Sequence, residues 1–431
     1  APLVYPRAGV SPDPDFVTLP ASRLPVVARP DVLVVGGGSA GVSAAVAAAR
    51  AGAETWLIER FSYTGGLATG GMIILLLTLD DGAGKQAVAG LCQEMVERME
   101  RRGGVWYPPR EQWDDPDPAL VEHCRRWGLV WGSAPHRVRY SVAFDPYAFI
   151  FAADEMLREA GVRVLYQTWA CEPLLEDGRI AAVVVQNKSG RQAIVPRVVV
   201  DTTGDGDVFA AAGEPFETER VHPWLWFEMG GVGDIEKALE AGGLFFRTTG
   251  RDRALVPWGG EARVREKIDA TDPAEVSAAL AECRRMVEEE AARLRRDAPG
   301  FEDAYISLMA DQLGITESRR LQGRHVMVRD DLNRRFDDTI ARTGHWTKYD
   351  CVYNIPYGSL LTRGTANLLA AGRCISVDHR VNHATKEIPA CMATGQAAGI
   401  AAALGAEGRD ATKVDVATLQ KRLRDAGAIL E

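Results

Sequence analysis

The stretch VLVVGGGSAG, residues 32–41, decides the fold class of this chain. Its first four residues are aliphatic, which predicts a short buried strand of a parallel sheet. An alanine-rich segment at about residues 40–50 predicts a helix, and Thr55-Trp56-Leu57-Ile58 predicts a second strand. The three elements together have the length of a βαβ unit, about 30 residues. The sequence therefore predicts an α/β fold with a Rossmann-like domain.

Glycines between the first strand and the helix follow the spacing GxGxxG. Gly36 permits a tight turn, Gly38 lets backbone N–H groups approach a pyrophosphate, and Gly41 lets the helix pack closely on the strand. The dipole of the helix favours an anion at the same place. Glu59 lies 18 residues after Gly41, where a carboxylate can accept hydrogen bonds from both ribose hydroxyls. This register predicts a dinucleotide site rather than a glycine-rich turn without a ligand.

Further glycine clusters lie far along the chain, at the ends of predicted strands or the starts of predicted helices. They are TGGLATGG at 64–71, DTTGDGD at 201–207, AGR at 371–373 and GQAAG at 395–399. Such dispersal suits a long cofactor that is contacted along its whole length, as FAD is. The absence of a second GxGxxG and of any CxxC disfavours an internal NAD(P)H domain and a disulfide-reductase mechanism.

These motifs resemble those of FAD-dependent oxidoreductases of the glutathione-reductase-like flavoprotein superfamily. The segments NLLAAGR at 367–373 and CMATGQAAGIAAAL at 391–404 are similar, more narrowly, to a bacterial branch of FAD-dependent oxidoreductases. The resemblance covers about residues 26–75, 145–210 and 314–405. It implies FAD as the cofactor, bound by Gly36, Gly38, Ser39, Ala40, Gly41, Glu59, Arg60, Gly66, Leu67, Ala68, Ala170, Thr203, Gly204, Asp205, Gly372, Arg373, Gln396, Ala397 and Ala398.

The resemblance assigns the nucleotide half of FAD to four places in the chain. Residues 36–41 meet the pyrophosphate, and Glu59 and Arg60 meet the adenosine ribose. Ala170 bonds the adenine through its backbone, and residues 203–205 close the adenosine side.

The flavin half is assigned to two further segments. Residues 66–68 are expected beside the flavin or the ribityl chain. A helix at about 394–404 would aim its N-terminus, at residues 395–398, at the flavin pyrimidine oxygen and stabilise the negative charge of reduced flavin. One position departs from the family pattern, because related flavoproteins often have an acid after the AG pair and this chain has Arg373.

Four side chains are candidates for chemistry at the flavin. Arg319 lies in the segment ESRR, which resembles a family segment, and can clamp a carboxylate substrate or pair with an acid. His379, His383 and Cys391 lie between residues 372 and 395, where the flavin ring is expected. Three interpretations stay open: acid/base residues, a metal site using the two histidines, and ordinary packing. We predict no metal, because no tight ligand spacing exists, and choose His383 as the base.

Composition limits the partners of the chain. It has 431 residues, with 50 Lys and Arg against 59 Asp and Glu, and the net charge of −9 argues against nucleic acid or an anionic membrane as the main partner. The seven cysteines form no paired motif, as is typical of a reducing compartment, and we find neither a signal pattern nor an apolar run of spanning length. We expect a cytoplasmic protein with a small-molecule substrate, an unknown electron acceptor and an open question of homo-oligomer formation.

The expected organisation is a discontinuous FAD-binding domain with an insertion. Residues 26–213 form its first part, 214–352 an inserted α+β substrate domain, and 353–431 the C-terminal part. The expected function is oxidation of a small organic substrate by hydride transfer to flavin N5. Two alternatives stay open: a non-redox or sulfur-transfer enzyme that resembles thiazole synthases, and a flavoprotein that modifies tRNA.

Overall fold

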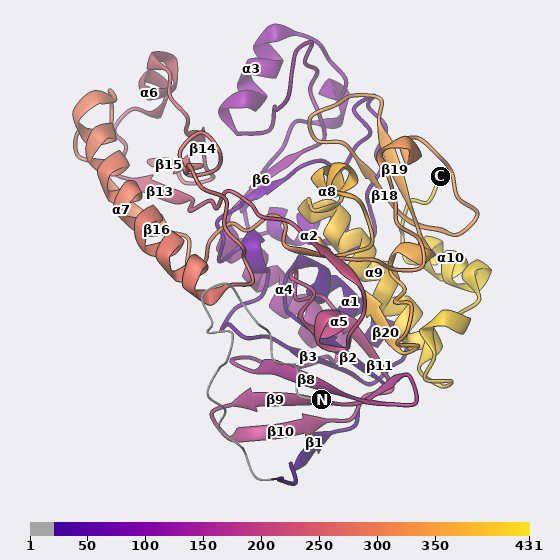
Figure 1. Cartoon of the computed structure of the whole chain (residues 1–431). Helices are drawn as coiled ribbons and strands as arrows, with labels where there is room; N and C mark the ends of the chain where they lie inside the picture. Colours follow the sequence, from indigo (N-terminus) through magenta and orange to yellow (C-terminus); the bar gives the residue numbers. More distant parts are fainter. Residues whose placement is uncertain (1–20) are drawn as a thin grey trace.

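A five-stranded parallel sheet forms the centre of the molecule, and its strands come from both halves of the chain (Figure 1). The computed structural model describes residues 21–431. In sheet order the strands are β20 (Leu368–Ala370), β11 (Val198–Asp201), β2 (Val32–Val35), β3 (Thr55–Ile58) and β7 (Arg163–Leu165). Every neighbouring pair is parallel. Because β20 extends the sheet that β2 begins, the discontinuous Rossmann-like domain predicted from the sequence is confirmed.

Two helices that are far apart in sequence pack directly on each other beside this sheet. They are α1 (Ser39–Arg50) and α9 (Ile388–Gly405). A Cβ at Gly395 would lie 2.2 Å from the backbone oxygen of Ala40, and a Cβ at Gly399 would lie 2.1 Å from that of Ala44. Only glycine allows backbones to approach so closely, so these glycines serve the contact between the helices.

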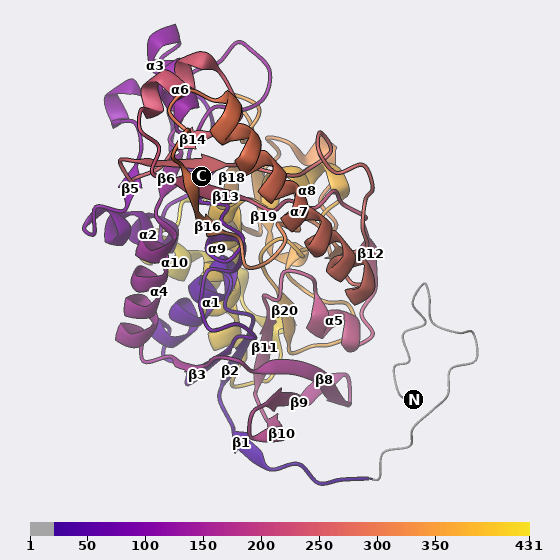
Figure 2. The ribbon, with the colours of Figure 1, turned by 90° about the vertical axis from the view of Figure 1, so that its left-hand side faces the viewer.

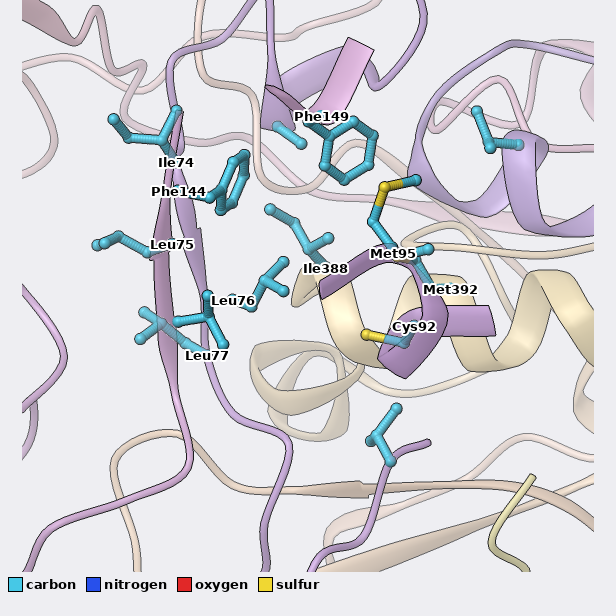
Figure 3. Packing of buried hydrophobic residues seen from close by; sticks show 14 of the residues in the cluster. Ile74, Leu75, Leu76, Leu77, Cys92, Met95, Phe144, Phe149, Ile388 and Met392 are labelled. Carbon is cyan, nitrogen blue, oxygen red and sulfur yellow. The ribbon is translucent and has the colours of Figure 1, made fainter. Parts of the chain in front are cut away.

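Helix α9 is a core helix. Within the described residues it is the one helix long and apolar enough to cross a membrane, and 83% of that stretch is buried inside the protein. Figure 3 shows Ile388 and Met392 of α9 packed near Phe144 and Met95. The helices that surround the pair are α2 (Leu91–Glu100), α4 (Pro146–Ala160) and α10 (Val416–Asp425).

A second sheet projects from the parallel sheet, as both views show (Figures 1 and 2). Strands β8 (Trp169–Glu176), β9 (Arg179–Asn187) and β10 (Gly190–Ile194) form an antiparallel meander. β1 (Val26–Ala28) adds a parallel edge to β10.

The remaining strands lie mostly on the opposite side of the parallel sheet. A four-stranded sheet within the predicted insertion is covered by the long helix α7 (Pro273–Asp297) (Figure 2). Its strands are β14 (Phe246–Arg247), β15 (Arg253–Val256), β13 (Phe227–Gly230) and β16 (Tyr305–Met309), with α6 (Ile235–Ala241) beside them. A three-stranded sheet comes from the N-terminal half, namely β4 (Leu75–Leu76), β6 (Val142–Phe144) and β5 (Val105–Trp106), and α3 (Pro118–Arg126) accompanies it.

Two further strand pairs lie within the insertion and at its C-terminal boundary. β12 (Phe216–Thr218) pairs with β17 (Arg319–Leu321), and β18 (Thr339–Gly344) pairs with β19 (Val352–Pro356). The expected boundary between residues 352 and 353 falls at the start of β19, so it divides a hydrogen-bonded hairpin. Two short helices complete the fold: α5 (Asp207–Ala211) and α8 (His379–Thr385).

Candidate functional site

A cavity opens at the carboxyl ends of β2, β3, β11 and β20, where open α/β sheets bind their ligands; we call it the sheet-end cavity. The predicted cofactor-binding residues that line it are Gly36, Gly38, Ser39, Ala40, Glu59, Arg60, Gly66, Leu67, Ala68, Ala170, Thr203, Gly204, Gly372 and Arg373. It is also lined by Val35, Ile58, Phe61, Gly65, Thr168, Trp169, Thr202, Asp207, Gln312, Ala371, Lys386, Ile388 and Cys391. The fold thus collects into one cavity segments that are dispersed along the sequence.

The turn before α1 has the form that the glycine spacing predicts. Gly36 has φ +101° and lies against Thr202, whose backbone oxygen would be 2.6 Å from a Cβ at this position. Gly38 has no neighbouring atom within 4 Å of such a Cβ, and it lines the cavity. Within the described part of the chain no side chain caps the N-terminus of α1, so its N–H groups can bind an anion. Gly41 does not line the cavity. A Cβ there would lie 1.8 Å from the oxygen of Gly36, so this glycine allows α1 to pack closely on the turn.

Glu59 is held rigidly at the end of β3. Its Oε2 accepts a hydrogen bond from the N–H of Gly37 at 2.5 Å, and its Oε1 accepts one from the N–H of Phe61 at 2.7 Å. The side chain is 6% exposed. A carboxylate offers about four lone pairs, so both oxygens retain capacity to accept hydrogen bonds from a ligand.

Aromatic rings accompany Arg60 at this end of the cavity. The guanidinium lies 5.0 Å from the ring centroid of Phe61 and 5.5 Å from that of Trp169, within cation–π range. Ala170 of β8 lies beside Trp169 in the lining. These residues give the Glu59 end of the cavity flat surfaces as well as polar groups.

Arg373 occupies the position where related flavoproteins often have an acid. Its Nη2 donates a hydrogen bond to Oδ1 of Asp205 at 2.6 Å, while its buried Nε has no partner among residues 21–431. Asp205 also accepts a hydrogen bond from Ser318 and lies behind Arg373, outside the lining. Burial alone would raise the pKa of Asp205, but the guanidinium and the Ser318 hydroxyl lower it below its ordinary value. The unpartnered Nε leaves Arg373 a donor for a ligand in the cavity.

The α9 end of the cavity differs from the expectation. The helix begins at Ile388 and not near Thr394, with a proline in its first turn. Gln396 therefore lies inside the helix, where its Oε1 accepts a hydrogen bond from the N–H of Leu91 at 2.9 Å and its Nε2 donates one to the oxygen of Ala426 at 3.1 Å. The expected helix start near Thr394 is wrong, and none of Gln396, Ala397 and Ala398 lines the sheet-end cavity, so their contact with the flavin stays a prediction. Lys386, Ile388 and Cys391 line it instead.

Comparison with known proteins supplies the family. The family model described as FAD dependent oxidoreductase matches residues 31–423. This chain belongs to the FAD-dependent oxidoreductases. It is therefore an enzyme with FAD as its cofactor, and the free N-terminus of α1, the open side of Gly38, the carboxylate of Glu59 and the unpartnered Nε of Arg373 fit that group.

Solved structures that resemble this oxidoreductase are distant. A p-nitrophenol 4-monooxygenase from Pseudomonas putida has 13% sequence identity and a TM-score of 0.48, over 91% of this chain and 83% of that one. A geranylgeranyl bacteriochlorophyll reductase-like protein from Thermoplasma acidophilum has 15% identity and a TM-score of 0.45, over 92% and 83%. An anhydrotetracycline hydroxylase from Streptomyces rimosus has 13% identity and a TM-score of 0.48, over 92% and 65%. No curated protein matches the chain.

The four candidates for catalysis in this oxidoreductase lie in different surroundings. Arg319 donates hydrogen bonds to the oxygen of Asp205 at 3.1 Å and to Oδ1 of Asp207 at 2.9 Å. Arg319 is buried and does not line the cavity. It fixes the turn after β11, which matches pairing with an acid, the second of the two roles expected for it. Cys391 lines the cavity, and burial raises the pKa of its thiol to about 12, so the thiol stays protonated at neutral pH.

The two histidines of α8 do not line the sheet-end cavity. His379 is 60% exposed, and its Nδ1 is 2.9 Å from Oε2 of Glu317. Among the described residues, Glu219, Glu317 and His379 offer ligand atoms within 4.8 Å of one another, and His383 is not among them. Glu317 already pairs with the guanidinium of Arg320, so its charge is balanced without a metal ion.

His383 lies one helical turn before Lys386. Its ring stacks on Trp346, with ring centroids 5.0 Å apart, and lies 5.5 Å from the ring of His345. Part of His383 is exposed, yet the packed neighbours, and after them the ammonium of Lys386, lower its pKa to about 4. His383 is therefore neutral at pH 7 and can accept a proton.

Several residues at or near the cavity were not predicted from the sequence. Lys386 lies in the very stretch expected at the flavin, and its charge beside the start of a helix was a usable signal. Gln312 and Trp169 lie in segments without a motif, so no pattern of residues marks them. Trp346 reaches His383 only through the β18–β19 hairpin, a long-range contact that one sequence does not reveal.

Proposed function

We propose that this FAD-dependent oxidoreductase oxidises a small organic substrate by removing a hydride from a C–H bond beside a hydroxyl or amine. Bound FAD supplies the acceptor for that hydride at flavin N5, and oxygen or an external acceptor then takes the electrons. The supporting observation is the unequal polarity of the sheet-end cavity. Glu59 marks one end, whereas Leu67, Ile388 and Cys391 line the α9 end together with Lys386. A mainly apolar end remote from the ribose-binding carboxylate suits a flavin ring.

We also propose that the oxidoreductase belongs to the glutathione-reductase-like branch. Support comes from the β2–α1–β3 unit with Glu59 at its end and from the return of the chain to the sheet at β20.

A base for the heteroatom proton completes the proposal. When the C–H hydride leaves, the hydroxyl or amine loses a proton and the substrate becomes a carbonyl or an imine. His383 is our candidate for accepting this proton, because it is neutral at pH 7 and lies one turn from Lys386 of the lining. Cys391 is a poor acceptor because its thiol keeps its own proton.

Anaerobic reduction of the bound flavin tests the proposal. The FAD-loaded enzyme is mixed with a panel of alcohols, hydroxy acids and amines, and bleaching of the flavin absorbance is followed. We expect at least one compound to bleach it, and the absence of bleaching by every compound would favour a non-redox enzyme. His383→Asn should retain FAD and slow the bleaching by about 10²–10⁴-fold. The matched variant His379→Asn should react at the wild-type rate, and equal rates in both variants would exclude His383 as the base.

A further inference from the structure

A cluster of half-buried aromatic rings begins where the sheet-end cavity ends. The Nζ of Lys386 lies 5.9 Å from the ring centroid of Trp346, and Lys386 itself lines the cavity. Trp346 stacks on His383 and meets the ring of Trp131 edge-on, with centroids 5.7 Å apart. Trp131 and Trp346 are half-buried and His383 is exposed in part, so each ring keeps open surface. We call these three residues the aromatic cluster.

The loop that carries Trp346 is held by buried charges. Arg139, 3% exposed, forms an ion pair with the fully buried Asp80, whose Oδ1 is 3.1 Å from the Nε of Arg139. The Nη1 of Arg139 donates hydrogen bonds to the backbone oxygens of His345 at 2.7 Å and Lys348 at 2.8 Å. The Nε1 of Trp346 donates one to the oxygen of His383 at 2.8 Å. The aromatic cluster is thus fixed in place before any ligand arrives, which lowers the entropy cost of binding.

The charges around the aromatic cluster are predominantly positive. Lys386 and Lys348 both act on His383, and no carboxylate does so to a comparable extent. Lys386 forms an ion pair with Glu387, whose Oε1 lies 3.5 Å from its Nζ, whereas Lys348 is exposed. Flat rings beside these ammonium groups complement a flat anion.

We propose that the aromatic cluster and its two lysines bind an aromatic carboxylate, so that the substrate of this enzyme is an aromatic acid. The inference rests on the proposed function, which requires a reducing substrate at the α9 end of the cavity. The ring of the acid packs on Trp346 and Trp131, and its carboxylate pairs with Lys386 or Lys348. The oxidisable carbon then lies toward Ile388 and Cys391, the apolar part of the lining.

Binding of benzoate to the FAD-loaded enzyme tests the inference. Benzoate has no C–H bond beside a hydroxyl or amine, so its binding is independent of hydride transfer. Calorimetry and the shift of the flavin absorption spectrum give its Kd, and benzamide and cyclohexanecarboxylate are the neutral and the non-aromatic controls. We expect benzoate to bind on the order of tenfold more tightly than either control. Equal affinity of the three probes, or no binding of benzoate, would overturn the inference.

Variants locate the bound probe. Trp346→Leu and Lys386→Met should each raise the Kd of benzoate on the order of tenfold, while Trp346→Phe, which keeps a ring, should stay near the wild type. The Kd of benzoate in Lys348→Met measures the contribution of the Lys348 charge to binding. This measure is independent of the sheet-end cavity, because Lys348 does not line it. Lys413→Met, with a side chain that is 79% exposed, is the matched control and should change nothing. An unchanged Kd in Trp346→Leu would contradict the inference, whereas benzoate binding without flavin bleaching by any compound would contradict the proposed function alone.

Discussion

Glycines lie beside a helix at both ends of the sheet-end cavity, but they have different roles. At the β3 end, Gly38 has open space where a side chain would be. At the α9 end, Gly395 and Gly399 face the backbone of α1 at distances that exclude any side chain. Glycine in a motif therefore signals a close approach, and whether a ligand or another helix approaches is decided by the fold.

Alanine at the two α9 glycines should have the largest effect. Gly395→Ala and Gly399→Ala each place a methyl group about 2 Å from a backbone oxygen of α1. We expect each to lower the free energy of unfolding by about 1–3 kcal/mol, with or without FAD. Urea unfolding of the apo and FAD-loaded proteins measures this. Gly408→Ala, where no atom lies within 4 Å of the new Cβ, should be neutral. If the α9 variants lost only FAD affinity, the glycines would be cofactor ligands after all.

Glu59→Gln should weaken FAD binding at the β3 end by a comparable free energy. Both oxygens of Glu59 accept backbone hydrogen bonds, and glutamine has only one acceptor oxygen for two donors. Loss of charge-assisted hydrogen bonds of about 1.5–3 kcal/mol should lower FAD affinity by roughly ten- to a hundredfold. Titration of apoprotein with FAD, followed by fluorescence quenching, gives the value. The exposed Glu54→Gln is the matched control, and identical affinities in the two variants would remove Glu59 from the site.

Gly38→Ala should separate cofactor binding from folding. The added methyl group meets no atom of residues 21–431, so the apoprotein should unfold at the wild-type urea concentration. FAD would meet the methyl group, and we expect a loss of affinity on the order of tenfold, within the usual cost of overpacking, about 1–3 kcal/mol. The opposite result, lower stability with unchanged FAD affinity, would erase the contrast with Gly395.

His345→Asn should change the pH dependence of stability at the α9 end. His345 is 4% exposed, and burial lowers its pKa from 6.5 to about 3. Below pH 6.5 the unfolded chain therefore binds a proton that the folded protein does not, and stability falls as the pH falls. The loss between pH 6.5 and 5 should be about 1.6 kcal/mol, and it should be absent in the variant. Unfolding of both proteins at the two pH values measures it. His379→Asn should behave as the wild type does.

Sequence reasoning succeeded where the signal is local. The strand, turn and helix at residues 32–50 and the acid at 59 lie within 30 residues of one another, and the fold realises them as predicted. It failed at α9, where Pro389 marked the true helix start but the glycines of residues 395–399 drew the assignment downstream. The pairing of Arg373 with Asp205 joins residues 168 positions apart, and no pattern in a single sequence announces such a partner.

The contact of α1 with α9 also affects the order in which the enzyme folds during its synthesis. Ala40 and Gly395 are in contact although they are 355 positions apart in the sequence. Contacts of such large sequence separation raise the contact order and slow folding. While the ribosome is still making the residues of α9, the finished α1 has no partner for its alanine face, which makes this stage vulnerable to aggregation. FAD cannot find a closed cavity until residue 391 has left the ribosome. The cofactor therefore acts late, stabilising by mass action a nearly finished fold.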